Sequence, residues 1–556
     1  MTDIENRAFE MSKNFLETEK QYRLGFVEAE MSNPKTKNLG ECFAEDTAKG
    51  LDILWQADND LCKLFENTLY SQDFDLFAKD VLCALQKGGR IIISGCGSTG
   101  RLAMRIEASF RIAIKKAAEN KGELLKLEDK VVALMTGGDY AIIRAVESFE
   151  DYIELGMMQA KELGLTDKDV LVGVTATGET TSILGTAKQA LDDGAKVWMV
   201  VCTKPESILG KLKRADDVYT NEKCHSLYMN CGGMAVTGST RMQSSTIEQA
   251  VISAALETAL DKLVDDGWVS DKKYLCEGFE KCVGLLKDEQ TAKAMALQTD
   301  KEKELYEKGG HVTYFADEYL LDILADTTER GPTFSVPPFR PQSRKDLTLS
   351  LAFVKNPLVD TQEAWEKCFE RIPRCVDKTN EEYSEIGIKD EDIKRIPKIN
   401  LDALYEFKIG NENDEEREEG QSLATWVGFD GDAPEEFYKT SENYRERNVI
   451  IVNKQNKQMH KTRMKMFEHL AFKLFVNSFS TGTMAKMGRI LGNYMVYINI
   501  SNKKLIDRAT RIVSDLCNIS YDEANYQLFL TKLILEEQKI DGKAAIETIN
   551  RLNGKK

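Results

Sequence analysis

The stretch SGCGSTGRLAMRIEASF, residues 94–110, decides the fold class. It follows an isoleucine run at 91–93, which predicts a buried strand, and it leads into apolar residues with helical spacing. Gly95, Gly97 and Gly100 have the spacing G-x-G-x-x-G between strand and helix. Glycines let the backbone approach an anion closely, and the first N–H groups of the next helix point toward it. The stretch therefore predicts an α/β fold with a phosphate site at this turn.

The glycine spacing alone does not identify the phosphate compound. A dinucleotide site also needs an acidic residue about 20 residues after the glycines, to hold a ribose. Here the interval contains Lys115, Lys116 and Lys121, followed by a run of mixed charge at 123–129. A nicotinamide or flavin enzyme stays an alternative, but we expect a different phosphate ligand and no cofactor.

A second loop of similar composition lies further along the chain. The apolar run at 170–174 predicts another buried strand, and it is followed by TATGETTS, residues 175–182. Like Ser98 and Thr99 in the first loop, its threonines offer hydroxyl groups to a phosphate. The carboxyl ends of parallel strands share one edge of the sheet, so the two loops should meet at one small phosphorylated ligand. Alternatively, these hydroxyl groups are ordinary helix N-caps.

Composition limits the classes of function. The chain has 556 residues, enough for two or three domains, and its net charge of −16 opposes general binding to nucleic acids or anionic membranes. Its 12 cysteines form no C-x-x-C pair, which suits a reducing cytoplasm, and no run approaches the ~18–20 apolar residues of a membrane span. We expect a cytoplasmic protein without a metal site, because no metal-ligand spacing relates the histidines His225, His311, His460 and His469.

Strands and helices alternate twice along the chain, and this predicts two doubly wound parallel sheets. In the first half we expect strands at 91–94, 131–135, 170–174 and 197–202, with helices at 101–117, 141–163 and 182–193. In the second half we expect strands at 309–315, 347–353 and 449–452, with helices at 318–328 and 362–372. The triplet TRM precedes a long helix in each half, at 240–242 and 462–464, as a duplicated domain would leave it.

Several motifs together resemble the sugar isomerase (SIS) domain family of N-acetylmuramic acid 6-phosphate etherases and glucokinase regulatory protein. In the first half these are SNPKTKNL (32–39), GCGSTGRLA (95–103), GGDYAIIRAVESFED (137–151), GVTATGETTS (173–182) and VTGSTRM (236–242). DTTERGPTF (326–334) and the run at 473–505 are similar to the second domain and C-terminal helices of glucokinase regulatory protein. Because etherase subunits carry one such domain, two domains place the chain closer to glucokinase regulatory protein.

The resemblance implies a fold, a set of domains and a site. The fold would be two SIS domains, which are flavodoxin-like, three-layer and built on parallel sheets. We expect a helical segment at 1–60, a first SIS domain at 61–285, a diverged second one at 286–490 and a helical cap at 491–556. The ligand would be a phosphorylated hexose or amino sugar, and a sugar kinase is the implied partner. The implied site residues are Gly97, Ser98, Thr99, Glu150, Thr175, Thr177, Thr180, Thr181, Glu329 and Lys473. Alternatively, Glu150 and Glu329 face solvent and Lys473 lies on a helix surface.

One position departs from the etherase pattern. The resemblance implies a catalytic Glu nine residues after Gly100, and this chain has Ser109 there. A hydroxyl cannot replace a carboxylate in a proton transfer that contributes about 10²–10⁴-fold. Glu107 is expected to point elsewhere on the helix, so Glu150 would be the remaining acid or base. We therefore expect a sugar-phosphate sensor of the glucokinase regulatory protein type. The alternatives are an etherase or sugar-phosphate isomerase that uses Glu150, and a scaffold with vestigial sites.

Overall fold

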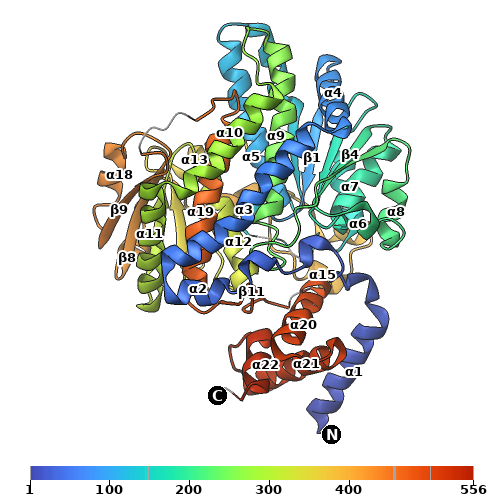
Figure 1. The fold of residues 1–556 in the computed structure, drawn as a ribbon, viewed down its shortest axis with the longest axis vertical. Helices are drawn as coiled ribbons and strands as arrows, with labels where there is room; N and C mark the ends of the chain where they lie inside the picture. Colours follow the sequence, from blue (N-terminus) through green and yellow to red (C-terminus); the bar gives the residue numbers. More distant parts are fainter. Residues whose placement is uncertain (1, 145, 147–148, 455–458, 501, 555–556) are drawn as a thin grey trace.

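The computed structural model describes residues 2–144, 146, 149–454, 459–500 and 502–554. In these residues the chain forms two parallel β-sheets, each flanked by helices, and further helices lie at both ends (Figure 1). The predicted fold class is therefore confirmed. No helix in the described part of the chain combines the length and the apolar character that crossing a bilayer requires.

The first unit is built on a five-stranded sheet with the order β2-β1-β3-β4-β5 and only parallel neighbours. This is the strand order of flavodoxin-like folds. Its strands are β1 (Ile91–Gly95), β2 (Val131–Met135), β3 (Val170–Val174), β4 (Lys196–Val201) and β5 (Cys224–Tyr228). Its helices are α4 (Gln72–Gln86), α5 (Ser98–Ala118), α6 (Ile153–Glu162), α7 (Thr181–Asp192), α8 (Lys213–Tyr219) and α9 (Gln243–Val264).

The second unit repeats this topology with one strand fewer. Its sheet has the order β7-β6-β8-β9, again parallel, so its four strands follow the same order as β2-β1-β3-β4 of the first sheet. The strands are β6 (His311–Phe315), β7 (Ala352–Lys355), β8 (Ser422–Gly428) and β9 (Glu446–Ile451). The helices are α11 (Glu289–Glu307), α12 (Leu320–Phe334), α13 (Thr361–Phe369), α14 (Asn380–Glu385), α15 (Asp390–Ile393), α16 (Leu401–Tyr405), α17 (Glu415–Glu418), α18 (Glu435–Thr440) and α19 (Met466–Lys486).

Two central helices join the units. Nearly every residue of α9 and of α19 is buried, which is typical of helices enclosed by protein on all sides. The helices pack against each other, and α19 also contacts α11 and α12 of the second unit. The TRM triplets lie just before α9 and α19, so they mark equivalent positions in the repeated topology.

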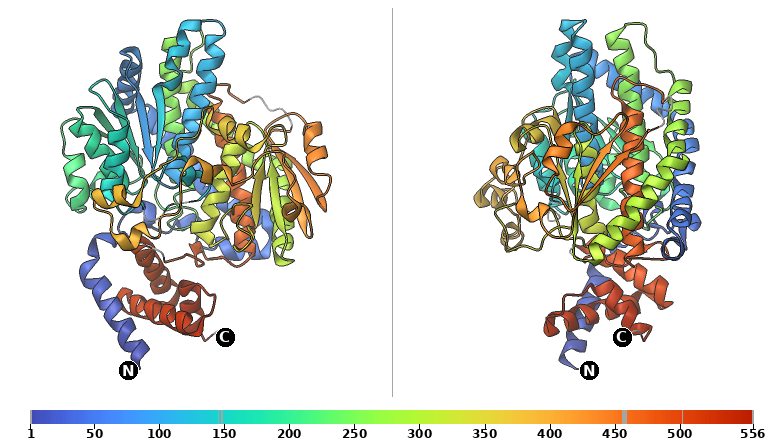
Figure 2. Two further views of the ribbon diagram at one scale, coloured as in Figure 1. Left: turned by 180° about the vertical axis from the view of Figure 1, so that it is seen from behind. Right: turned by 90° about the vertical axis from the view of Figure 1, so that its left-hand side faces the viewer.

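The remaining helices flank this body. The helices α2 (Leu39–Glu45), α3 (Thr47–Leu69) and α10 (Lys272–Gly284) pack on α9 and α19, and a short hairpin of β10 (Ile490–Leu491) and β11 (Tyr494–Met495) follows α19. The C-terminal helices α20 (Lys503–Cys517), α21 (Tyr521–Gln538) and α22 (Ala544–Leu552) protrude from the body together with α1 (Asp3–Thr18) (Figure 2). We call α1 and α20–α22 the terminal helices.

The structure differs from the predicted elements at four places. Strands β5 and β8 were not expected, and the strand expected at 347–353 is confined to Ala352–Lys355. The edge strand β5 is polar and half-exposed, so it lacks the apolar run that marks the central strands. The helix expected over 141–163 begins only at Ile153. Residues 139–142 form a 3₁₀ turn instead, because the backbone and side chain of Asp139 bond to Arg374 of the second unit.

Candidate functional site

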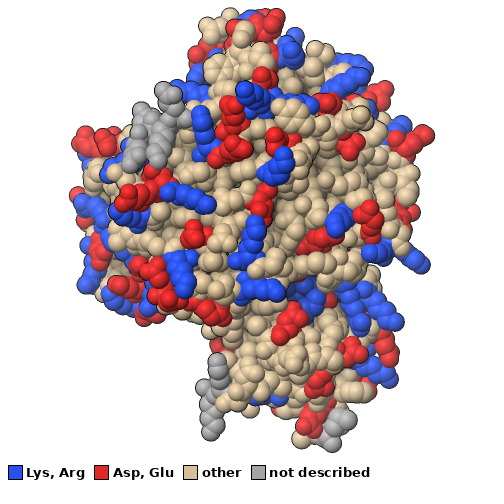
Figure 3. Space-filling view, in the orientation of Figure 1, with Lys and Arg blue, Asp and Glu red and all other residues tan. Residues whose placement is uncertain are grey.

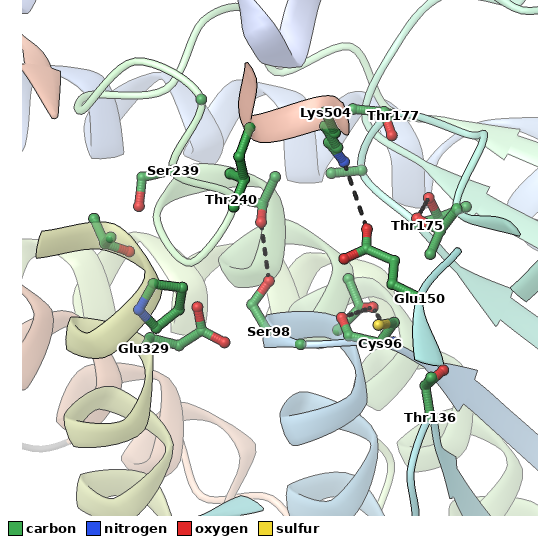
Figure 4. A pocket seen from close by; sticks show the side chains of 18 of the residues that line it. Cys96, Ser98, Thr136, Glu150, Thr175, Thr177, Ser239, Thr240, Glu329 and Lys504 are labelled. Atoms are coloured by element: carbon green, nitrogen blue, oxygen red, sulfur yellow. Dashed lines mark hydrogen bonds and ion pairs between the residues drawn. The ribbon is translucent and has the colours of Figure 1, made fainter. Parts of the chain in front are cut away.

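A cavity of about 150 Å³ lies at the carboxyl ends of β1 and β3, between the two units and the first turns of α20 (Figure 4). Loops of the first unit form one side of it, α12 of the second unit contributes Glu329, and α20 contributes Lys504. This is the edge of a doubly wound sheet at which ligands bind. On the face of the molecule in Figure 3, basic and acidic side chains are interspersed, so a phosphate would depend on local groups.

The loop between β1 and α5 needs its glycines for packing and for its turn. A Cβ at Gly100 would overlap Met135 of β2, and one at Gly95 would overlap Thr99. Gly97 has a φ of +57°, a conformation that favours glycine. Ser98 directs its Oγ toward the cavity, where it lies 3.1 Å from Thr240 Oγ1 (Figure 4). The Oγ1 of Thr99 donates to Cys96 O and accepts from Cys96 N, both at 3.0 Å, so this hydroxyl closes the turn.

The loop between β3 and α7 contributes three of its four predicted threonines to the cavity. Thr175, Thr177 and Thr180 line it, and the hydroxyl groups of Thr175 and Thr180 lie 2.8 Å apart. Thr181 is the first residue of α7 and is not among the lining residues.

A third hydroxyl-rich loop, which the sequence analysis did not assign to the site, ends at the start of α9. Its Ser239 and Thr240 line the cavity. Ser239 Oγ is buried and has no hydrogen-bond partner among the described residues, so this donor is available to a ligand. The pattern GST in VTGSTRM, which precedes a helix as in the other two loops, could have identified it.

The motif SNPKTKNL holds this third loop in place from the N-terminal side. Asn33 donates to Gly233 O at 2.7 Å, and Thr36 donates to Ala235 O at 2.8 Å. Asn493, in the β10–β11 hairpin, donates to Thr36 Oγ1 and accepts from the Thr237 hydroxyl, both at 3.0 Å. The motif therefore supports the backbone that leads to Ser239.

The charged groups of the cavity come from separate elements. Glu150 lies in the turn before α6, and its carboxylate is 3.9 Å from the ammonium of Lys504 (Figure 4). Lys504 also lies 3.8 Å from Glu179, a buried residue of the β3–α7 loop that pairs with Arg214. Glu329 pairs with Arg101 of α5. Lys504 was missed in the sequence analysis because nothing in its local pattern separates it from a surface lysine.

Lys473 is half-buried beside the cavity. Its ammonium donates to Arg241 O at 3.0 Å, Thr246 Oγ1 at 2.7 Å and Asn477 Oδ1 at 3.0 Å. Burial lowers its pKa to about 8. It lines an adjoining cavity of about 40 Å³ that shares Ser98, Arg101 and Glu329 with the larger one. Its role in binding stays a prediction, and the same holds for the other site residues.

The carboxylate that the etherase pattern implies near Gly100 has no substitute in this part of the first unit. Ser109 is buried in the middle of α5 and does not line the cavity. Glu107 is engaged by the guanidinium groups of Arg371, Arg374 and Arg111. Burial alone would raise the pKa of Glu107, but these three groups lower it, so the carboxylate stays ionised. It is therefore unsuited to donate a proton.

The second sheet carries a different chemistry at the equivalent edge. The residues after β6 are Ala316, Asp317 and Glu318, and those after β8 include Asp430 and Asp432. Acidic side chains in place of hydroxyl groups oppose a phosphate by like-charge repulsion. Among the described residues, the edge of the first unit therefore suits a phosphorylated ligand better than that of the second.

Comparison with known proteins shows what the first unit is similar to. Residues 76–191 match the model of the glucokinase regulatory protein N-terminal SIS domain. An N-acetylmuramic acid 6-phosphate etherase of Aliivibrio fischeri (strain MJ11) is 37% identical over 173 residues, which are 31% of this chain and 51% of that protein. The first unit therefore contains a segment similar to the SIS domains of glucokinase regulatory protein and of the etherases. The chain spans about half the length of such a relative, 51% for the Aliivibrio protein.

Other relatives of the chain are more distant. N-acetylmuramic acid 6-phosphate etherase 1 of Bacillus licheniformis is 27% identical over 240 residues, which are 43% of this chain and 70% of that protein. Among solved structures, tagatose-6-phosphate ketose/aldose isomerase from Escherichia coli has a TM-score of 0.41 at 10% identity, covering 80% of this chain and 94% of that one. Glucosamine-6-phosphate deaminase from Thermotoga maritima has a TM-score of 0.38 at 13% identity, covering 78% and 94%.

Proposed function

We propose that this protein binds a phosphorylated sugar in the cavity between its two units. The observation that carries the proposal is the convergence of three hydroxyl-bearing loops on one cavity, with Ser239 Oγ buried and unpartnered among them. Two of these loops lead into α5 and α7, whose first N–H groups favour an anion. The phosphate would therefore lie against the loops of the first unit.

The sugar would extend from the loops toward the charged groups. Carboxylates accept hydrogen bonds from sugar hydroxyls, and Glu150 and Glu329 reach the cavity from different units. The ammonium of Lys504 would offset the phosphate charge. A local cation is needed because the chain as a whole has a net charge of −16. A ligand held in this way connects the first unit, the second unit and the terminal helices.

Two finer functions fit such a ligand. The names of the relatives favour an etherase reaction, in which Glu150 would act as acid or base. The match to the regulatory protein domain, together with Ser109 in place of a catalytic carboxylate, favours binding without turnover. Because Glu107 is held ionised by arginines, we propose a sensor of the glucokinase regulatory protein type, with the etherase as the second candidate.

A ligand screen tests the common part of the proposal. The full chain is heated with hexose 6-phosphates, with N-acetylmuramic acid 6-phosphate and with the unphosphorylated sugars. A binding ligand at 100 times its Kd should add about 2.7 kcal/mol of stability, and the sugars without phosphate should add none. Equal stabilisation by phosphorylated and plain sugars would contradict a phosphate site at the loops.

A lactate assay separates the two finer functions. Incubation with N-acetylmuramic acid 6-phosphate should release no lactate above that of a Glu150→Gln variant if the chain is a sensor. Release that depends on Glu150 would establish the etherase.

A sugar kinase as partner is a separate part of the proposal, and it rests on the likeness to glucokinase regulatory protein. The rate of a purified hexose kinase, measured with this chain present, should depend on the hexose phosphate that the screen identifies. A rate that is the same with and without the chain would remove that kinase as a partner.

A further inference from the structure

The connection between β7 and β8 of the second unit crosses over to the first unit, where it packs on the turn that carries Glu150. Helix α15 of this connection lies beneath the first unit, near α6 (Figure 1). Phe149 packs edge-to-face on Tyr383 with ring centroids 5.8 Å apart, and the Tyr152 hydroxyl donates to Asp392. Phe149 directly precedes Glu150, and Tyr152 follows it by two residues, so the contacts lie on both sides of Glu150 in the sequence.

Arg371 anchors the crossing segment. Its guanidinium donates to Glu107 through Nε at 3.0 Å and through Nη2 at 2.9 Å, and it also pairs with Asp139. The side chains of Glu107 and Asp139 are at most 3% exposed, so these interactions are shielded from solvent. Two further hydrogen bonds hold Asp139 on this segment. Asp139 N donates to Arg374 O, and Arg374 N donates to the Asp139 carboxylate.

Asp139 begins the short 3₁₀ turn that leads toward the cavity. Ala141 in this turn accepts from Arg101 at 2.8 Å and lines the cavity, as do Val146 and Glu150 further along. The turn is thus fixed to the first unit at Arg101 and to the second unit at Arg371.

We infer that Arg371 is a positioning residue of the sugar site, and that it sets the place of the Glu150 carboxylate by holding the turn at Asp139. The inference rests on the proposed function for the identity of the ligand, whereas the contacts of Arg371 do not depend on that function. Arg371 itself does not line the cavity. An arginine is required because its planar group bonds Glu107 in a bidentate manner and reaches Asp139 as well, which a lysine ammonium cannot reproduce.

Calorimetry on the full chain tests the inference, with inorganic phosphate, fructose 6-phosphate and glucose 6-phosphate as probes. Arg371→Lys should weaken the sugar phosphates about 10- to 100-fold, because their hydroxyls lose Glu150, and leave inorganic phosphate unchanged. Glu150→Gln should show the same selective loss, and the double variant should lose no more than either single one. Equal losses for phosphate and sugar phosphates in Arg371→Lys would overturn the inference, since they indicate a general structural effect.

Arg90→Lys is the matched control. Arg90 pairs with the buried Asp169 at 2.8 Å, just before β1 and β3 and thus at the end of the first sheet opposite the cavity. Replacing Arg90 should therefore leave the sugar selectivity unchanged. Hydrogen exchange of the ligand-free protein gives a readout that needs no ligand. Exchange at 139–144 and 149–152 should accelerate in Arg371→Lys, and in Arg371→Ala, but not in Arg90→Lys. Unchanged exchange there would overturn the inference, whereas failure of the wild-type chain to bind any probe would affect only the proposed function.

Discussion

At the scale of single residues, the two lysines near the cavity differ in what surrounds their ammonium groups. The ammonium of the half-buried Lys473 has hydrogen-bond acceptors on the protein itself. Lys504 lines the cavity, and its partners among the described residues are carboxylates at 3.8 and 3.9 Å. Lys473 is one of the site residues that the resemblance implies, but the geometry favours Lys504 as the group that offsets the phosphate charge.

Substitution separates the two lysines. Lys504→Met should weaken sugar-phosphate binding about 10- to 100-fold, as the loss of a hydrogen bond to a charged group does, with little effect on Tm. Lys473→Met should mainly lower the free energy of unfolding, because it leaves buried acceptors without a donor. Calorimetry and thermal unfolding measure both effects. A larger loss of affinity in Lys473→Met than in Lys504→Met would reverse this assignment.

Ser239 gives a second prediction at this scale. Ser239→Ala should leave the Tm of the free protein unchanged or raise it, because it removes a buried hydroxyl without a partner. The same change should weaken sugar-phosphate binding about tenfold or more. Thr99→Ala is the comparison, because its hydroxyl closes the β1–α5 turn and its loss should cost about 1 kcal/mol of stability. An unaltered affinity in Ser239→Ala would mean that no ligand donor is needed there.

At the scale of elements, a buried carboxylate helps to hold α20 on the body. Glu30, which is fully buried, accepts from Arg508 at 3.0 Å and from Arg511 at 2.9 Å, both on α20. Arg508 lies one turn after Lys504 on this helix and also lines the cavity. Holding α20 at Glu30 thus also holds Lys504 at the site.

Removing this charge should be costly. Glu30→Gln leaves the buried Arg508 guanidinium without its counter-ion and leaves Arg511 with Asp507 alone, and breaking a buried pair in this way destabilises a protein by about 3–5 kcal/mol. Urea unfolding measures the change. Asp60→Asn is the control, because Asp60 forms an exposed pair with Lys35 that contributes about 0–1 kcal/mol. Comparable costs for the two variants would contradict the anchoring role of Glu30.

The same carboxylate predicts a pH dependence. Burial raises the pKa of Glu30, but Arg508 and Arg511 outweigh it and lower the pKa from 4.5 to about 2. A lowered folded-state pKa contributes stability that is present above pH 4.5 and is lost as the pH falls toward 2. Unfolding measured between these pH values should therefore show a steeper loss in the wild-type chain than in Glu30→Gln. Parallel curves would contradict the prediction.

At the scale of the whole molecule, the two units share one apolar core. The largest buried cluster runs from Ile91 and Val172 in the first sheet, through Phe279 and Phe475 around α19, to Val312 in the second sheet. Since α9 and α19 pack against each other with nearly all their residues buried, separating the units would expose much apolar surface.

We therefore expect the two sheets to unfold in one cooperative transition. Hydrogen exchange read separately on β1–β4 and on β6–β8 through a urea series should give the same midpoint for both. A sugar phosphate at 100 times its Kd should shift both midpoints together, since it adds about 2.7 kcal/mol to one shared equilibrium. Two resolved midpoints would show that the units unfold independently.

Local sequence determined much of the fold and part of the site. The central strands β1, β2 and β3 are runs of apolar residues, and Gly95, Gly97 and Gly100 allow the tight turn into α5. These features need only neighbours along the chain, so their pattern predicts them directly. The loops with Ser98 and with Thr175, Thr177 and Thr180 lie at the same cavity because parallel strands end at the same edge.

Tertiary structure decided the rest. The edge strand β5 forms by pairing with β4. The turn at Asp139 forms by contact with Arg371 and Arg374, which are 232 and 235 residues away in the sequence. Lys504 reaches the cavity because the charge of Glu30 holds α20 in place. Glu30 and Arg508, which form this ion pair, are 478 residues apart in the sequence. Pairing, charge compensation and burial between distant segments leave no periodicity in either segment, so only the assembled chain shows which lysine faces the cavity.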